Sequence, residues 1–302
     1  MNLNEKIDKI INHLNNKEFK TAINSCEKLI KSKIENTIVY NLYGKAYQNL
    51  GAYEKSISKF EKSIKINENN YFALNNLAIS LKAVEKFQLS EKNYKKCLKI
   101  KPDYLIGLIN FANLKEFLNE FEEAINLYSS ALGFANGTSE AYIFSKLSRL
   151  YLAIGELKKA REFALKCLKN YPRETNYYEL FSEMIDLEKD KEFFIDMENL
   201  YNSNNLTDSE IINLAFPLGQ GYEKLKNYKK AYAFFEKGNK LKKKQIKFNL
   251  GDFLTLTKSI KKIFTELDLQ KIKKKVSKKK NNIYLRYAKI WNYFNRANCC
   301  FA

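Results

Sequence analysis

The sequence predicts an all-α fold: a solenoid of about six to seven stacked helix-turn-helix units, followed by a basic helical extension. Two observations lead to this prediction. Side chains recur with a period of about 34 residues, and small, aromatic and proline residues each keep one place within that period. A fixed period in this range is typical of repeat proteins, whose units bury a continuous core only when they stack.

The repeats can be followed from one unit to the next. Gly44 and Phe60 recur 34 residues later as Ala78 and Tyr94, and the same shift leads into a third unit. A two-residue insertion precedes the unit that contains Ser148. On this register the units begin near residues 3, 37, 71, 105, 141, 176 and 212. The unit near residue 176 is the most degenerate.

Each unit is expected to form two antiparallel helices joined by a tight turn. A small residue at the eighth place lets the two helices approach closely, and large residues at the eleventh, seventeenth and twenty-fourth places fill the space around this contact. The small residues are Gly44, Ala78, Ala112, Ser148 and Gly219. Pro102 and Pro172 share a place just after the second helix, where a proline ends a helix without disrupting its interior.

This spacing resembles the tetratricopeptide repeat, in which small and aromatic residues keep similar places and a proline follows the second helix. The resemblance implies a right-handed superhelix whose concave groove is lined by the first helices and binds extended peptides or partner helices. It also implies which places face the groove. In this chain they are Asn41, Lys45, Asn75, Asn76, Lys82, Asn110, Asn113, Ser145 and Arg149.

Most of these predicted groove residues are asparagines. Their amides both donate hydrogen bonds to a peptide backbone and accept them from it. A ladder of such amides would hold an extended chain with little dependence on its side chains. The alternative is that they are ordinary polar residues of solvated helix faces, because asparagine is common throughout the chain.

Positive charge is concentrated after the repeats. The chain has a net charge of +19, and residues 222–280 hold 20 lysines and only 5 acidic residues. One interpretation is a nucleic-acid interface, in which lysines neutralise phosphates. The segment contains no arginine, however, and matches no named nucleic-acid fold. We therefore expect a repeat array over residues 1–247 and a lysine-rich amphipathic helix within 248–280 that packs on the last repeat.

The residues that could perform chemistry are scattered. His13, the sole histidine, lies at a core place of a first helix, and no partner suggests a triad or a metal cluster. Cys97 and Cys167 share a second-helix place where small residues pack, while Glu122 and Glu123 lie on the polar side of a helix. We expect neither an enzyme nor a metal or cofactor site. No signal peptide or membrane span is found, which predicts a cytoplasmic protein without a membrane partner.

The last residues, 281–302, differ in composition from the rest. They hold the only tryptophan, Trp291, and two cysteines. When the tail is written in A/T-favouring codons, deleting one A after the codon of Leu285 makes the next frame read Gly-Met-Pro-Arg-Ser-Gly-Thr-Thr. That string is similar to a phosphosulfate-binding loop. The alternative is a genuine helix or interaction tail.

The whole chain thus resembles the N-terminal part of bacterial tetratricopeptide-repeat sulfotransferases, with the transferase domain lost by a frameshift. The resemblance implies that the intact parent uses PAPS and that its groove presents an acceptor protein. Arg286, Tyr287 and Ala288 stand where the loop should begin, so no catalytic residue of the family is carried over. The predicted function is a non-catalytic module that binds proteins or peptides. The alternatives are an independent scaffold protein and a lysine-rich protein associated with nucleic acid.

Overall fold

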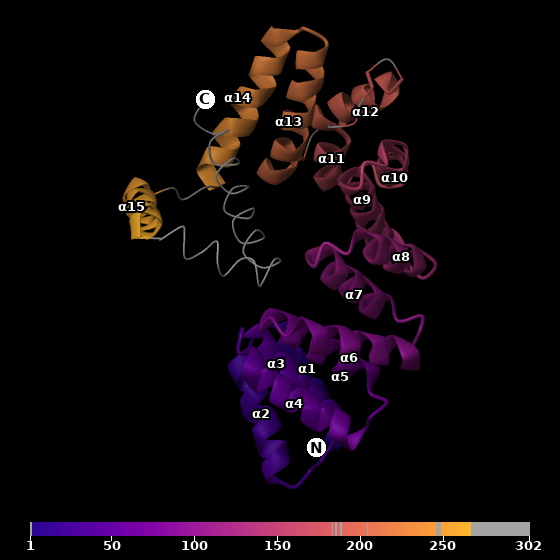
Figure 1. The fold of residues 1–302 in the computed structure, drawn as a ribbon, viewed down its shortest axis with the longest axis vertical. Helices are drawn as coiled ribbons and strands as arrows, with labels where there is room; N and C mark the ends of the chain where they lie inside the picture. Colours follow the sequence, from indigo (N-terminus) through magenta and orange to yellow (C-terminus); the bar gives the residue numbers. More distant parts are fainter. Residues whose placement is uncertain are drawn as a thin grey trace. The chain divides into compact units, whose positions relative to one another are not determined.

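A computed structural model describes residues 2–182, 184, 186–187, 189–203, 205–245 and 249–266. Across these residues the chain forms helices and turns without any strand (Figure 1). The chain divides into two compact units, residues 1–184 and 185–302. The predicted array over residues 1–247 therefore extends across both units.

The first unit is a succession of antiparallel helix pairs. Each second helix also contacts the first helix of the next pair, so neighbouring repeats share a core. The pairs are α1 (Leu3–Asn15) with α2 (Phe19–Lys31), α3 (Thr37–Asn49) with α4 (Tyr53–Ile66), α5 (Tyr71–Ala83) with α6 (Phe87–Ile100), α7 (Leu105–Phe117) with α8 (Phe121–Leu132), and α9 (Gly137–Ala153) with α10 (Leu157–Asn170). A 3-10 turn, η1 (Thr175–Tyr177), and the short α11 (Tyr178–Ser182) complete the unit.

Helix starts follow the repeat period. Asn2, Asn36 and Asn70 precede α1, α3 and α5 at intervals of 34 residues, and the side-chain oxygen of each accepts a hydrogen bond from the first turn of its helix. Such caps satisfy backbone N–H groups that have no partner within the helix. The fifth first helix was expected near residue 141, but α9 begins at Gly137. Asn136 causes this difference, because it forms a capping box with Ser139.

The turn between paired helices has one backbone conformation throughout. Lys17, Gly51, Glu85 and Asn119 lie 34 residues apart and have φ between 60° and 74°. Gly155 and Lys226 take the same left-handed conformation in later pairs, with φ of 82° and 59°. Glycine adopts this conformation without a steric cost, whereas lysine and glutamate adopt it only where the packing of both helices requires it.

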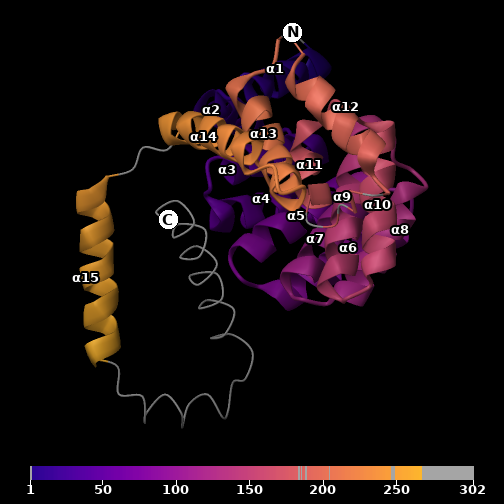
Figure 2. The ribbon, with the colours of Figure 1, turned by 90° about the horizontal axis from the view of Figure 1, so that it is seen from above.

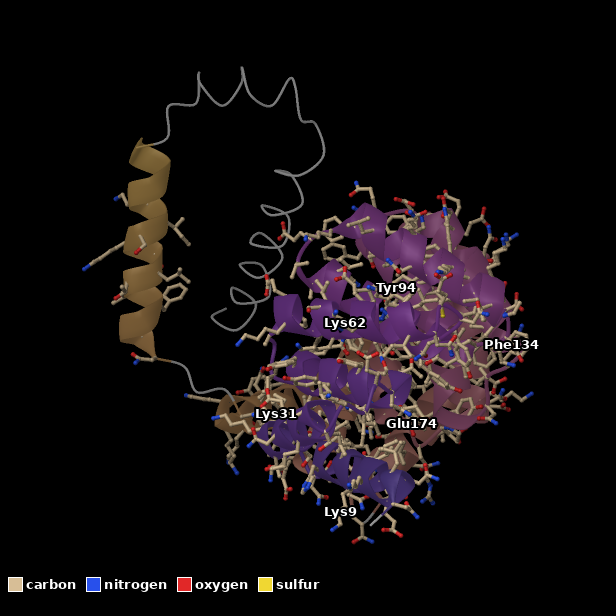
Figure 3. The ribbon with its side chains drawn as sticks, turned by 90° about the horizontal axis from the view of Figure 1, so that it is seen from below. Lys9, Lys31, Lys62, Tyr94, Phe134 and Glu174 are labelled. Carbon is tan, nitrogen blue, oxygen red and sulfur yellow. The ribbon has the colours of Figure 1, made fainter. Side chains whose placement is uncertain are left out.

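The predicted close approach within each pair is present. A Cβ atom on Gly44 would lie 2.6 Å from the ring of Phe60, and one on Gly219 would lie 2.6 Å from the ring of Phe235. The small residues Ala78, Ala112 and Ser148 are fully buried at the same place. Large buried rings fill the facing place in three consecutive pairs: Phe60, Tyr94 and Tyr128. Figure 3 labels Tyr94 among the helices of this unit.

The second unit contains one well-formed helix pair. Helices α13 (Asp208–Lys224) and α14 (Tyr228–Gln245) lie side by side (Figure 2), and α12 (Lys191–Tyr201) packs on α13. The start of α13 was expected near residue 212. It lies four residues earlier because Thr207 and Glu210 form a capping box. The degenerate unit predicted near residue 176 corresponds to η1, α11 and α12, whose first helix is only five residues long.

The basic extension is helical over part of its predicted range. Helix α15 (Leu250–Glu266) lies within the predicted segment 248–280, and Leu250, Leu254 and Leu256 on it are exposed. Its packing on the last repeat stays a prediction. The predicted tail, 281–302, and both predicted domain boundaries, near 247 and 280, lie outside the described residues. None of the described helices combines the length and apolarity needed to span a bilayer.

Candidate functional site

The surface formed by α3, α5, α7 and α9, here called the first-helix face, carries the predicted groove residues. Asparagine amides connect three of these helices. Asn76 Nδ2 donates to Asn41 Oδ1 at 3.1 Å, and Asn110 Nδ2 donates to Asn75 Oδ1 at 3.1 Å. Asn75 Nδ2 and Asn76 Oδ1 lie 3.4 Å apart and link the two pairs. These hydrogen bonds thus link neighbouring repeats.

Asn113 continues these contacts toward α9. Its Oδ1 accepts from the hydroxyls of Tyr128 at 2.8 Å and Tyr142 at 2.9 Å. Its backbone carbonyl accepts from Lys82 Nζ at 3.2 Å. One turn further along α7, Glu116 pairs with Lys146 of α9 at 2.8 Å. Polar contacts therefore connect α3 to α9 along one face of the unit.

Lys45 differs from these paired groups. Its Nζ donates to Gln48 Oε1 at 3.0 Å, and Gln48 Nε2 in turn donates to the carbonyl of Asn76 and to Ser80 Oγ. No carboxylate among the described residues pairs with the Lys45 ammonium. Burial lowers the pKa of Lys45, because a half-buried ammonium without a counterion loses hydration. An anionic group bound beside Lys45 would restore the lost stabilisation.

The nine predicted residues differ in how far a ligand can reach them. Asn75 and Ser145 are only 2% and 6% exposed, and Ser145 Oγ donates to the carbonyl of Tyr142. These two side chains serve the packing between helices. Asn41, Lys45, Asn76, Lys82, Asn110 and Asn113 are half-buried, and Arg149 is exposed. The reachable part of the first-helix face thus combines amides with the Lys45 ammonium, which has no carboxylate partner.

An apolar row on the same face was missed from the sequence. Ile38, Phe72 and Ile106 hold the second place of three consecutive first helices and are 47%, 48% and 55% exposed. Their spacing of 34 residues could have revealed the row. Apolar residues in a repeat are usually assigned to the core, however, and only the structure shows that these three face solvent.

A buried ion cluster lies between the third and fourth pairs. The Lys115 side chain is 2% exposed, and its Nζ lies 3.0 Å from Glu91, 2.5 Å from Glu120 and 2.8 Å from Glu123. Burial alone would lower the pKa of Lys115, but the hydrogen bonds that its ammonium donates to the three carboxylates outweigh this effect, and the pKa is raised. Glu123, expected on the polar side of its helix, has a side chain that is 59% exposed and also belongs to this cluster.

The other groups singled out from the sequence are structural. His13 was expected in the core, but it is partly exposed and its Nδ1 lies 2.6 Å from a carboxylate oxygen of Glu18. Cys26, Cys97 and Cys167 are buried, and burial raises the pKa of each thiol to about 12. A thiol with so high a pKa is a poor nucleophile at neutral pH. Within the described residues no cluster of His, Cys, Asp or Glu could hold a metal ion.

Comparison with known proteins identifies the repeat. The tetratricopeptide repeat family model matches residues 38–70, 73–104, 141–174 and 216–245. A search of curated proteins found none that matches this chain.

Several solved structures share the fold. PilF of Pseudomonas aeruginosa is 16% identical with a TM-score of 0.52, and the match covers 72% of this chain and 96% of PilF. A tetratricopeptide repeat protein of Parabacteroides merdae is 16% identical with a TM-score of 0.53, covering 84% and 97%. The C-terminal part of a repeat protein of Cytophaga hutchinsonii is 17% identical with a TM-score of 0.58, covering 78% and 95%. The chain therefore contains tetratricopeptide repeats in the matched segments and has the α-solenoid fold of these structures.

Proposed function

We propose that this protein is a non-catalytic module that binds an extended segment of a partner protein on the first-helix face. Its repeats are of a kind typical of protein–protein interaction scaffolds. The observation that supports the proposal best is the composition of this face: it carries half-buried amides from three repeats and Lys45, an ammonium without a carboxylate partner. Such a surface can pair with the backbone and the acidic groups of an extended chain.

A random nonapeptide library displayed on phage tests this proposal. Peptides selected on the whole protein are synthesised, and their dissociation constants are measured by fluorescence anisotropy. The double variant Asn110→Ala/Arg149→Ala is expected to weaken binding at least five-fold. The matched control is Lys62→Ala/Lys99→Ala, which alters exposed residues of the second helices α4 and α6 and should leave affinity within two-fold. Equal losses in both variants would contradict binding at the first-helix face.

The relation to sulfotransferases stays a prediction. The residues on which it rests, 281–302, lie outside the described residues, and the comparisons match the repeats alone. The encoding DNA tests it. A continuing sulfotransferase in the neighbouring frame would support the relation and would make an acceptor protein the ligand of the parent. If neither neighbouring frame encodes such a sequence, the relation to sulfotransferases is wrong, and an independent scaffold protein is the remaining interpretation.

A further inference from the structure

The apolar row on the first-helix face has a rigid centre at Phe72. Although it is 48% exposed, its ring lies 4.2 Å from that of Tyr71 and 5.6 Å from that of Tyr104, centroid to centroid. The rings of Tyr71 and Tyr104 are themselves 5.0 Å apart in an edge-on contact. Neighbouring rings in such arrangements stabilise one another. Phe72 is thus an exposed aromatic side chain whose position is already fixed.

Gly107 makes this arrangement possible. A Cβ atom there would lie 2.7 Å from Cδ1 of Tyr104, so the absence of a side chain lets the Tyr104 ring fold back over the first turn of α7. From there the ring reaches Phe72 of the preceding repeat. The rigid platform therefore depends on contacts made across two repeats.

A hollow of about 420 Å³ opens between Ile38 of α3 and Phe72 of α5. Its other walls carry Asn41 and the asparagines of the α4–α5 connection. The Asn70 amide is engaged, because its Nδ2 donates to Thr37 Oγ1 at 2.8 Å and its Oδ1 caps α5. The two apolar side chains remain open to a ligand. An apolar group that enters the hollow would remove both from water, and rigid aromatic anchors of this kind dominate the affinity of many interfaces.

The charge of Lys45 indicates what kind of ligand binds in the hollow between Ile38 and Phe72. Lys45 lies two turns along α3 from Ile38, which is about 10 Å at 1.5 Å per residue, and an extended chain covers that distance in about three residues. A second copy of this protein carries a net charge of +19, and the chain's own residues after 266 are rich in lysine. Both would be repelled by the unpaired Lys45. An acidic segment would be attracted.

We propose that Ile38 and Phe72 form an anchor site for one bulky apolar side chain of an extended acidic segment, and that a carboxylate about three residues away in that segment pairs with Lys45. This inference rests on the proposed function, because it specifies what the first-helix face binds. The amides of Asn41 and Asn76 lie between the two subsites and face the backbone of the bound segment.

Synthetic nonapeptides test the anchor. Each fluorescein-labelled peptide carries one leucine and one aspartate, one to five positions apart, in a Gly/Ser background, and binding to the whole protein is measured by anisotropy. The tightest binding is expected at a spacing of about three. Replacing the leucine by serine, or the aspartate by asparagine, should weaken it at least ten-fold.

Variants locate the two subsites. Phe72→Ala and, separately, Ile38→Ala should each weaken the best peptide at least five-fold. The control Phe134→Ala removes an equally exposed ring, 51% accessible at the end of α8 (Figure 3), and should leave affinity unchanged. Lys45→Met should weaken the aspartate peptide but not its asparagine counterpart. Thermal unfolding of each variant shows whether it is folded.

The outcomes separate the anchor from the proposed function. If library-selected peptides bind the first-helix face but Phe72→Ala and Ile38→Ala both stay within two-fold of the unaltered protein, the anchor is wrong and the proposed function stands. If no peptide of the spacing series binds while selected peptides do, the chemistry assigned to the segment is wrong. If the library yields no binder either, both inferences fail.

Discussion

At the scale of single residues, one place in the repeat shows how a cation can be held in two ways. At the eleventh place, Tyr47, Tyr151 and Tyr222 each have a lysine eight residues later whose Nζ lies 5.7, 5.3 and 4.5 Å from the ring centroid. In the fourth pair the order of charge is reversed. Lys115 holds the eleventh place and Glu123 follows eight residues later. A cation over a ring and an ion pair thus occupy equivalent positions.

The Lys115 cluster predicts a dependence of stability on pH. Burial alone would raise the pKa of Glu91, but hydrogen bonds from Lys95 and Lys115 outweigh it, so its pKa lies below the ordinary 4.5. A carboxylate with a lowered folded pKa stabilises the protein above its unfolded pKa, and this contribution is lost as the pH falls through the folded value. The free energy of unfolding should therefore decrease below about pH 4.5.

Lys115→Leu should make that decrease shallower, because the buried partner of Glu91 is gone. Leu81 is buried at the same place of the preceding repeat, so leucine fits the site. We expect a loss of roughly 1 to 2 kcal/mol at pH 7, reduced by the partial exposure of the glutamates. Urea unfolding between about pH 3 and pH 7, followed by circular dichroism, measures both effects. The control Lys166→Leu alters an exposed pair with Glu162, away from the cluster, and an equal slope for all three proteins would contradict the assignment.

At the scale of helices, the repeat period predicted the pairs and the close contacts within them. Gly44 and Phe60 could be placed face to face because only a small residue admits a ring at that distance. The exact starts of α9 and α13 could not be predicted from the sequence, because the caps at Asn136 and Thr207 lie outside the pattern of core residues. The place of Ile38 and Phe72 in the repeat could be read from the sequence, but their exposure could not, because periodicity does not show what covers a side chain.

Gly44→Ala tests the close contact between α3 and α4. The new Cβ would lie 2.6 to 2.9 Å from three atoms of the Phe60 ring, which is fully buried and cannot move aside cheaply. Overpacking of this kind costs about 1 to 3 kcal/mol, which outweighs a gain of about 1 kcal/mol in helix propensity. Gly133→Ala is the matched control, because its Cβ would meet only an ordinary contact of 3.6 Å. The midpoints of urea unfolding compare the two variants. Equal midpoints would show that α3 and α4 can move apart without a loss of stability.

At the scale of the whole molecule, the sequence predicted a concentration of positive charge after the repeats. The structure describes part of this segment, on α14. Lysines gather along α14, where Lys240, Lys242, Lys243 and Lys244 are exposed. Tyr228 and Tyr232 on the same helix are also exposed. Lysine and tyrosine together can contact phosphates and stack on bases. Contacts of lysines to phosphates carry no sequence information, however.

We therefore expect binding to nucleic acid that is weak and governed by counterion release. For a labelled 20-nucleotide single strand, anisotropy should give a dissociation constant that rises by tens of fold between about 50 and 200 mM salt, with no preference among sequences. Replacing Lys242, Lys243 and Lys244 by glutamine should reduce the slope, because fewer phosphates are neutralised. The variant Phe72→Ala, which is expected to weaken peptide binding, should leave the slope of the salt dependence unchanged. Tight binding that persists at 200 mM salt with a clear strand preference would instead make nucleic acid the principal partner, because only directed contacts survive screening.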